Sequence, residues 1–233
     1  MTHAPILEFD GAACPDGAGA GTMTARFLPG VLSVVRVEPG LRPAPLADMA
    51  VGLVEPARGR VLFLGEAWQA AGPEQNLARR ARIGRVFWEQ GWISNLNVLE
   101  NVTLPQRHHT RRPVPEIIAE AEALARRFGL ERLPAARPAR VDPRDLRRAE
   151  WVRAFLGNPA LVLLEEPLRG AGPEAAPRLF EAVREACARQ AAVLWLAERG
   201  RIDSPPDVPA AAYVLRGPSL EPAGTPAPVS PTP

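Results

Sequence analysis

Lysine is absent from this sequence, and its absence excludes more chemistry than any single motif establishes. All 28 residues in the combined lysine and arginine count are arginine. A Schiff base with a carbonyl substrate needs a lysine amine. The loop that grips nucleotide phosphates in many NTPases also needs a lysine at a fixed position. Neither chemistry is open to this chain in its usual form.

The chain is also poor in cysteine and in long apolar runs. Cys14 and Cys187 are its only cysteines, and they lie far apart without a CxxC or Cys/His spacing. This spacing predicts neither a disulfide framework nor a metal site. No apolar run reaches the roughly 18 residues of a membrane helix, and Met1 to Asp10 lacks the basic start of a secretory signal. We therefore expect a cytoplasmic protein that does not itself cross a membrane.

Composition favours one globular unit with a buried core. The chain has 233 residues, of which 46% are hydrophobic and 23% are charged. The formal net charge of +2 is too small to predict a nucleic-acid partner.

Apolar patterning predicts an α/β layer fold. Four short, mostly β-branched or continuous apolar runs are typical of strands; they are Val31–Val37, 59–64, Leu161–Leu164 and Ala191–Ala197. Apolar residues at helical spacing follow Pro115 and Pro177. Ala212 to Arg216 reads as one more strand, at an edge of the sheet. Strands that alternate with helices indicate α/β layers.

Two stretches of the sequence resemble one family. Ile83 to Val102 reads IGRVFWEQGWISNLNVLENV, and Arg137 to Pro173 contains NPALVLLEEP. In order and spacing they resemble the Q-loop region, and then the signature helix, Walker B strand and D-loop, of ABC transporter ATP-binding subunits. Within the family, NLNVLENVTLP and DLRRAEWVRAF are most similar to subunits of lipid-asymmetry transporters that serve MCE-type lipid carriers.

The resemblance implies an architecture. It is that of an α/β, P-loop NTPase-like ABC nucleotide-binding domain with a mixed-sheet core. One such domain would span residues 1–226, with a helical subdomain at about 92–158. Residues 227–233 are rich in proline and are predicted to be a disordered tail. The cofactors of the family are ATP and magnesium.

The expected phosphate loop has lost the residue types that bind phosphate. The family pattern GxxGxGK[ST][ST] falls on residues 37–45, VEPGLRPAP, where Gly40 remains. Glycines let backbone N–H groups wrap the phosphates, but Arg42 adds a side chain and Pro43 and Pro45 have no N–H. Ala44 has no oxygen for magnesium. Arg42 could act instead as a phosphate clamp, although a solvated loop arginine is the expected role.

The Walker B position keeps its carboxylates in altered form. Glu165 and Glu166 stand where the family has Asp-Glu, so Glu166 keeps the general-base position and Glu165 lengthens the magnesium-associated acid. This pair could be a surviving catalytic dyad. Without a phosphate cradle beside it, however, Glu166 has no placed γ-phosphate to activate water against. We expect the pair to be vestigial.

The other chemical positions of the family are also changed. The signature LSGGQ corresponds to residues 141–145, VDPRD, whose acids would repel phosphate. The Q-loop glutamine corresponds to Trp88, the D-loop aspartate to Gly172 and the switch histidine to Glu198. Because each ATP in a family dimer lies between the P-loop of one subunit and the signature of the other, this chain would spoil both sites of a pair. We expect no bound cofactor and no hydrolysis.

Three functions remain open from the sequence. The first is a non-catalytic ABC-type subunit that docks on a permease or a paralogous ATPase, possibly in lipid transport, at the inner face of the cell membrane. The second is an ATPase that works through altered residues. The third is a free-standing scaffold or a decaying gene product.

The docking hypothesis predicts a particular surface. The family resemblance implies that the region comprising Ile83 to Val102 and the helix from Pro115 to Phe128 forms the groove that receives the permease. Here it carries Trp88 and Trp92, which flank Gln90 and Gly91 in an expected loop. A pair of tryptophans is often core packing, but tryptophan is also enriched at interfaces. We therefore predict that Trp88, Gln90 and Trp92 bind a partner.

Overall fold

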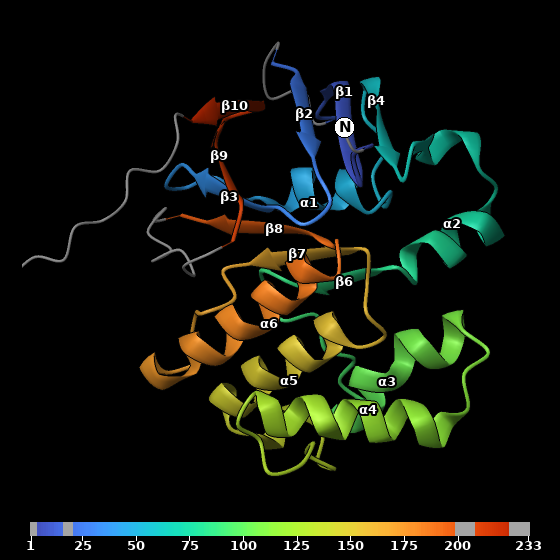
Figure 1. Cartoon of the computed structure of the whole chain (residues 1–233), viewed down its shortest axis with the longest axis vertical. Coiled ribbons are helices and arrows are strands. Elements are labelled where there is room, and N and C mark those ends of the chain that lie inside the picture. Colours follow the sequence, from blue (N-terminus) through green and yellow to red (C-terminus); the bar gives the residue numbers. More distant parts are fainter. Residues whose placement is uncertain (1–3, 16–20, 199–207, 224–233) are drawn as a thin grey trace, which may run out of the picture.

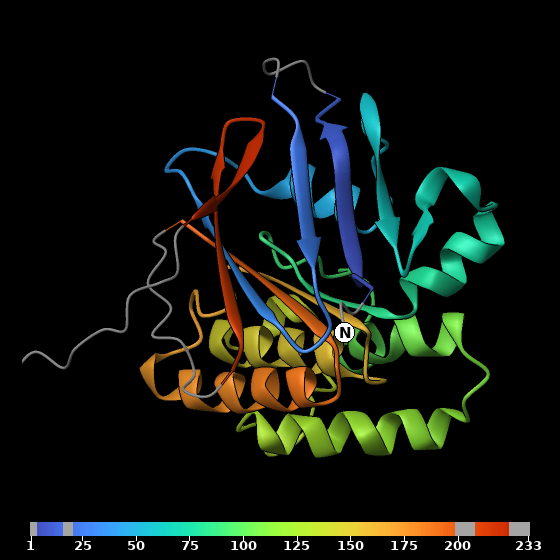
Figure 2. The same ribbon diagram turned by 45° about the horizontal axis from the view of Figure 1, so that its top comes forward.

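The chain folds into two sheets and a group of helices, with α1 between the sheets (Figures 1 and 2). The computed structural model describes residues 4–15, 21–198 and 208–223. The predicted tail at 227–233 lies outside these residues. The smaller sheet is antiparallel and has the strand order β2-β1-β4-β5. Its strands are β1 (Leu7–Ala13), β2 (Met23–Phe27), β4 (Arg58–Phe63) and β5 (Glu66–Ala67).

The larger sheet has the strand order β10-β9-β3-β8-β7-β6. Its strands are β3 (Leu32–Val37), β6 (Ile83–Val86), β7 (Leu161–Glu165), β8 (Ala192–Ala197), β9 (Ala210–Arg216) and β10 (Ser219–Ala223). All pairs are parallel except β9 with β10. The four predicted strand runs are confirmed as β3, β4, β7 and β8. The prediction that Ala212–Arg216 is an edge strand is wrong, because β10 pairs with β9 and takes the edge.

Helices cover the face of the larger sheet that points away from the smaller sheet (Figure 1). Within the described residues, the helices of this layer are α3 (Val98–His109), α4 (Val114–Arg127), α5 (Pro143–Phe155) and α6 (Ala176–Ala188). The other two α-helices there are α1 (Ala44–Ala50) and α2 (Pro73–Arg80). Three short 3-10 turns lie at Trp68–Ala70, Pro138–Arg140 and Pro173–Ala175. Among the described residues, no helix has the length and apolar character of a membrane span.

The larger sheet is buried on both faces, which explains its continuous apolar strands. Val162 and Leu164 of β7 pack in one core with α3 to α6. Leu161 and Leu163 face the other way, into a second core with α1 and the smaller sheet. β7 therefore lies between the two cores, and its last residue, Glu165, is buried at the end of the strand.

Gly84 fixes β6 against α5. A Cβ atom at this position would lie 1.6 Å from the carbonyl oxygen of Ala154 in α5. Only glycine permits an approach this close. The contact positions the segment that follows β6. This segment runs over the start of the helical layer.

Candidate functional site

The loop between β3 and α1 brings the predicted phosphate-loop residues together. Gly40 has a left-handed backbone, with φ of 85°. Pro43 directly precedes α1, and no side chain caps the N-terminus of this helix by a hydrogen bond. α1 is only seven residues long. Arg42 forms an ion pair with Glu89 at 3.1 Å, and both side chains are about 70% exposed (72% and 71%). Pro45 lies within the first turn of α1, after Ala44.

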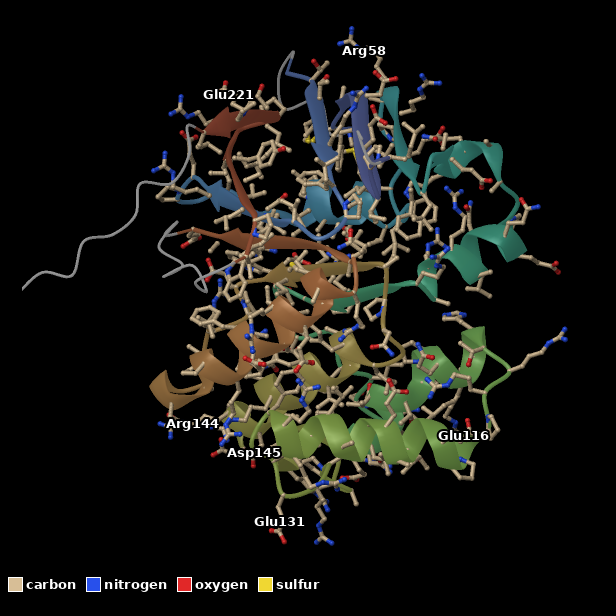
Figure 3. All side chains as sticks on the ribbon, viewed as in Figure 1. Arg58, Glu116, Glu131, Arg144, Asp145 and Glu221 are labelled. Atoms are coloured by element: carbon tan, nitrogen blue, oxygen red, sulfur yellow. The ribbon has the colours of Figure 1, made fainter. Side chains whose placement is uncertain are left out.

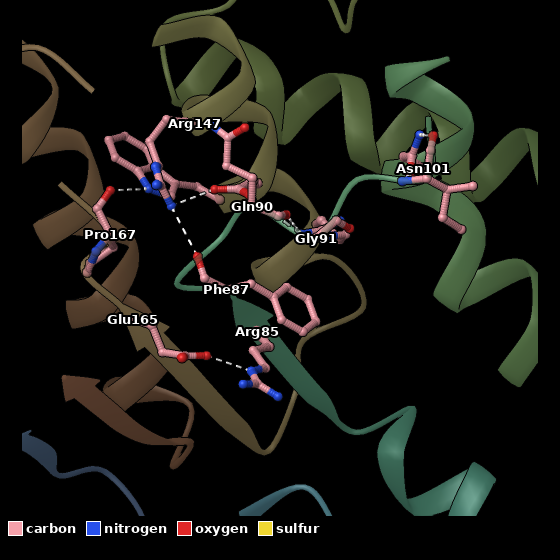
Figure 4. A network of polar contacts seen from close by, with 12 residues as sticks. Arg85, Phe87, Gln90, Gly91, Asn101, Arg147, Glu165 and Pro167 are labelled. Atoms are coloured by element: carbon pink, nitrogen blue, oxygen red, sulfur yellow. Dashed lines mark hydrogen bonds and ion pairs between the residues drawn. The ribbon is translucent and has the colours of Figure 1, made fainter. Parts of the chain in front are cut away.

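Glu165 ends β7 with a fully buried side chain, at 0% exposure. Its Oε1 accepts a hydrogen bond from Nε of Arg85 at 2.7 Å (Figure 4). Nη1 of Arg85 donates to Asp48 of α1, also at 2.7 Å. Burial raises the pKa of Glu165, while Arg85 and the backbone amide of Trp88 act to lower it. The second oxygen, Oε2, has no hydrogen bond of ordinary geometry within the described part of the chain.

Glu166 contacts the residue at the predicted switch position. The backbone of Glu166 is left-handed, with φ of 44°. Its Oε1 accepts the backbone N–H of Glu198 at 2.6 Å, immediately after β8. The general-base position of the family is thus hydrogen-bonded within the chain. We use the term nucleotide edge for residues 38–45, 165–166 and 198.

The start of α5, where the sequence predicts the signature position, is capped by an acid. The side chain of Asp142 accepts the backbone N–H of Arg144 at 2.8 Å, and Asp145 lies in the first turn. Arg144 and Asp145 are at the surface (Figure 3). A carboxylate that already occupies a helix N-terminus disfavours a second anion there.

Trp88 and Trp92 are both half-buried, each against an arginine. The guanidinium of Arg169 lies 4.2 Å from the ring centre of Trp88, and that of Arg153 lies 4.7 Å from the ring centre of Trp92. Trp92 also packs on the helical core, although its Nε1 has no hydrogen-bond partner within the described residues. We call residues 87–92 the tryptophan segment.

Two arginines of α5 fasten the tryptophan segment to the helical layer. Arg153 donates to the carbonyl oxygens of Gln90 and Gly91 at 2.8 and 2.9 Å. Both of those residues have left-handed backbones. Arg147 donates to the carbonyl oxygen of Arg169 at 3.0 Å and reaches that of Phe87 at 3.5 Å. The segment is therefore an ordered turn, whose shape depends on side chains from α5.

Glu150 is the acid of this network and was not identified from the sequence. Its side chain is 0% exposed, and it lies 2.6 Å from Arg147 and 3.8 Å from Arg153. Burial raises the pKa of Glu150 to about 7, against the pull of the two arginines. The i, i+3 spacing of arginine and glutamate on one helix was visible in the sequence, but the same spacing is common on solvated helix faces.

A groove lies beside the tryptophan segment, with a volume of about 190 Å³. It lies between β6, α3 and α5; among its lining residues are Leu53, Arg85, Phe87, Val102, His109 and Arg153. Leu53, which lines the groove, has an exposed apolar side chain. His109 Nδ1 and Arg153 Nε have no hydrogen-bond partner within the described residues. The groove therefore joins apolar surface to the side chains of Arg85, His109 and Arg153.

No group of three or more His, Cys, Asp or Glu side chains among the described residues could hold a metal ion.

Known proteins with this fold are ATP-binding cassettes. No protein-family model matches the chain. A dimeric bacterial ABC transporter cassette superposes with a TM-score of 0.77 at 16% identity, covering 92% of this chain and 96% of that one. An ATP-binding subunit of an ABC transporter gives 0.79 at 22% identity, covering 92% and 88%. The α/β ABC-cassette fold predicted from the sequence is confirmed.

Curated relatives match over a shorter span. The phosphonates import ATP-binding protein PhnC of Alcaligenes faecalis is 31% identical over 58% of this chain and 51% of its own length. The intermembrane phospholipid transport system ATP-binding protein MlaF of Escherichia coli K12 is 26% identical over 62% and 54%. The chain thus spans about half the length of the first curated relatives that it matches. Its sequence is similar to those of ABC transporter ATP-binding subunits.

Proposed function

We propose that this chain is a non-hydrolytic ABC-type subunit that docks on a membrane permease or on a paralogous ATP-binding subunit. Through that partner it would lie at the cytoplasmic face of the membrane. The single observation that best supports the loss of hydrolysis is the ion pair between Arg85 and Glu165. Nε of Arg85 lies 2.7 Å from Oε1 of Glu165, and the Glu165 side chain is fully buried. The ion pair puts an arginine of this chain against the acid that associates with magnesium in P-loop NTPases.

The nucleotide edge does not fit magnesium–ATP. P-loop NTPases cradle the β- and γ-phosphates with loop N–H groups and a lysine, and hold magnesium with a loop Ser or Thr and the Walker B acid. Pro43 and Pro45 lack N–H groups, and the sequence contains no lysine. Oε2 of Glu165 is the one feature that resembles a metal ligand. A single oxygen, without a hydroxyl ligand opposite it, is far from the octahedral set that magnesium requires.

The general-base position supports the same proposal. Glu166 accepts the Glu198 N–H at 2.6 Å, so one carboxylate oxygen is already committed. The histidine that would complete the family arrangement is absent, since no histidine follows His109 in the sequence. No reaction step is therefore assigned to Glu165 or Glu166.

The tryptophan segment and the adjoining groove are the proposed partner surface. Trp88 and Trp92 are half-buried aromatics, a type that often contributes most to interface energy. Gln90 lies between them, and its carbonyl oxygen is held by Arg153. A surface that is fixed before binding loses less conformational entropy when a partner docks.

Lipid transport is the finer part of the proposal. It rests on the sequence likeness to MlaF, a phospholipid-transport ATP-binding protein, and on the segments NLNVLENVTLP and DLRRAEWVRAF. PhnC, a phosphonate importer, matches at similar strength. The substrate of the complex is therefore best approached through its permease, by identifying which membrane protein co-purifies with the tagged chain.

Phosphate release from purified protein tests the loss of hydrolysis. A repaired variant, Arg42→Gly, Pro43→Lys, Ala44→Ser and Pro45→Thr, is the matched comparison. We expect no release above background from either protein, because the signature, Q-loop, D-loop and switch positions stay altered and catalytic groups that act as a unit are not additive. Release from the unaltered chain would refute the proposed function. Release from the repaired chain alone would show that the phosphate loop was the only defect.

A further inference from the structure

The guanidinium of Arg85 joins three elements at the nucleotide edge. β6 and β7 pair in parallel, with Arg85 opposite Leu163. Side chains alternate along a strand, so Arg85, Leu163 and Glu165 project from one face of the sheet. α1 packs on that face, since Leu46 and Met49 belong to the same core as Leu163. Arg85 thus lies between the last residue of β7 and the helix that follows the phosphate-loop position.

One guanidinium holds two carboxylates, of which Glu165 is fully buried and Asp48 is partly exposed. Its Nε lies 2.7 Å from Glu165 Oε1, and its Nη1 lies 2.7 Å from Asp48 Oδ1. The side chain of Arg85 is 9% exposed and that of Glu165 is 0% exposed. A carboxylate buried this fully needs a positive partner. The planar guanidinium can meet two acids at once, which an ammonium group does less well.

The Arg85 guanidinium lies beside the acid that P-loop NTPases pair with a metal ion. In P-loop NTPases the positive charge beside the Walker B acid is the magnesium ion that arrives with the nucleotide. Here the positive charge belongs to β6 of the chain itself and engages Oε1 of the acid. A magnesium ion at Glu165 would lie beside this guanidinium, and the two positive charges would repel each other.

We propose that Arg85 is an internal counter-ion that takes the place of nucleotide-bound magnesium at Glu165. β6, β7 and α1 then keep their arrangement without any ligand. The inference rests on the proposed function, because it explains how a cassette that binds no nucleotide retains a buried Walker B acid. It goes beyond that function by assigning a stabilising role to one residue outside every family motif.

A double-mutant cycle on thermal unfolding tests the proposal. The variants are Arg85→Leu, Glu165→Leu and the double substitution, each measured with and without magnesium–ATP. Each single substitution leaves a charge without its main partner and is expected to lower the melting temperature by roughly 10 °C. The double substitution replaces the pair by apolar groups and is expected to regain at least half of that loss. Arg42→Leu, which breaks an exposed ion pair, is the control and should change the melting temperature by less than about 2 °C.

The outcomes separate this inference from the proposed function. If the single substitutions match the wild type, or if the double variant loses the sum of both, Arg85 is not a counter-ion. If Arg85→Leu fails to fold, folding of the double variant supports the inference and its failure overturns it. A rise in the melting temperature of the wild type with magnesium–ATP would show that the chain still binds nucleotide and would refute that part of the proposed function. The ligand-free cycle would still decide the role of Arg85.

Discussion

The nucleotide edge and the tryptophan segment are neighbours, joined by the Arg42–Glu89 ion pair, but their side chains make different kinds of contact. At the nucleotide edge, Glu165 and Glu166 each give one carboxylate oxygen to a donor of this chain, Arg85 for Glu165 and the Glu198 backbone for Glu166. In the tryptophan segment, the rings of Trp88 and Trp92 are half-buried against the guanidinium groups of Arg169 and Arg153. Under the proposed function, the first region has its carboxylates occupied by the chain itself, and the second presents aromatic surface to a partner.

The largest expected effect comes from breaking the network that shapes the tryptophan segment. Arg147→Met removes the closest positive partner of Glu150, which is 0% exposed, and the donor to the Arg169 carbonyl. We expect a loss of about 3–5 kcal/mol in the free energy of unfolding, because the buried acid is left without its main partner. Urea unfolding measures the loss. A change below about 1 kcal/mol would mean that the network does not hold the segment.

Capture of the membrane partner should distinguish the tryptophan segment from the nucleotide edge, with a smaller change in free energy than the Arg147 substitution causes. Trp88→Ala or Trp92→Ala should weaken capture of the membrane partner by about 2 kcal/mol or more, if these rings lie at an interface centre. Glu166→Gln should leave capture unchanged. Pull-down from membranes of the source organism measures the effect.

Folding has to be controlled in that experiment. Trp92 packs against the helical core, so its loss also removes buried contacts and can cost about 3–5 kcal/mol of stability. Variants are compared only where their unfolding midpoints stay well above the assay temperature. Equal capture by folded tryptophan variants would remove the surface assignment, and weaker capture by Glu166→Gln would indicate that the nucleotide edge still acts.

The free energy of unfolding should depend on pH through Glu150. Burial raises the pKa of Glu150 from 4.5 to about 7 in the folded protein. The folded state then holds this proton more tightly than the unfolded state, so stability falls as pH rises from about 4.5 through about 7. We expect a decline of roughly 2 kcal/mol between pH 5 and pH 8, because this interval covers most of the shift and one pKa unit corresponds to about 1.4 kcal/mol.

Glu150→Gln isolates that contribution, since the amide can still accept from Arg147 but does not titrate. Urea midpoints of the wild type and the variant at pH 5 and pH 8 give the comparison. The same decline with pH in both proteins would assign the effect to other groups, such as Glu165.

Sequence reasoning worked best where a pattern is local. The apolar runs at β3, β7 and β8 were found because strands buried on both faces are continuous and distinct. β1 and β2 were missed, although Leu7, Phe9 and Phe27 are buried at alternate positions of half-exposed strands. Such short alternating strands are interrupted by charged residues and are harder to separate from loops.

The site was predictable in composition but not in contacts. The altered residues at 40–45, 165 and 166 could be aligned with family motifs, because those motifs are contiguous. Arg85 could not be recognised in the same way, since its partners Asp48 and Glu165 are 37 and 80 residues away in the sequence. Only the pairing of β6 with β7 and the position of α1 bring the three together.

Calorimetric titration of magnesium–ATP into the unaltered protein tests the central claim most directly. Family affinity depends on the loop donors, the lysine and the magnesium ligand, and this sequence lacks all three at residues 38–45. We expect no saturable binding with a Kd below about 100 μM, which corresponds to roughly −5.5 kcal/mol. Saturable, magnesium-dependent binding with a Kd below that value would contradict the claim that this chain has lost the ability to bind nucleotide.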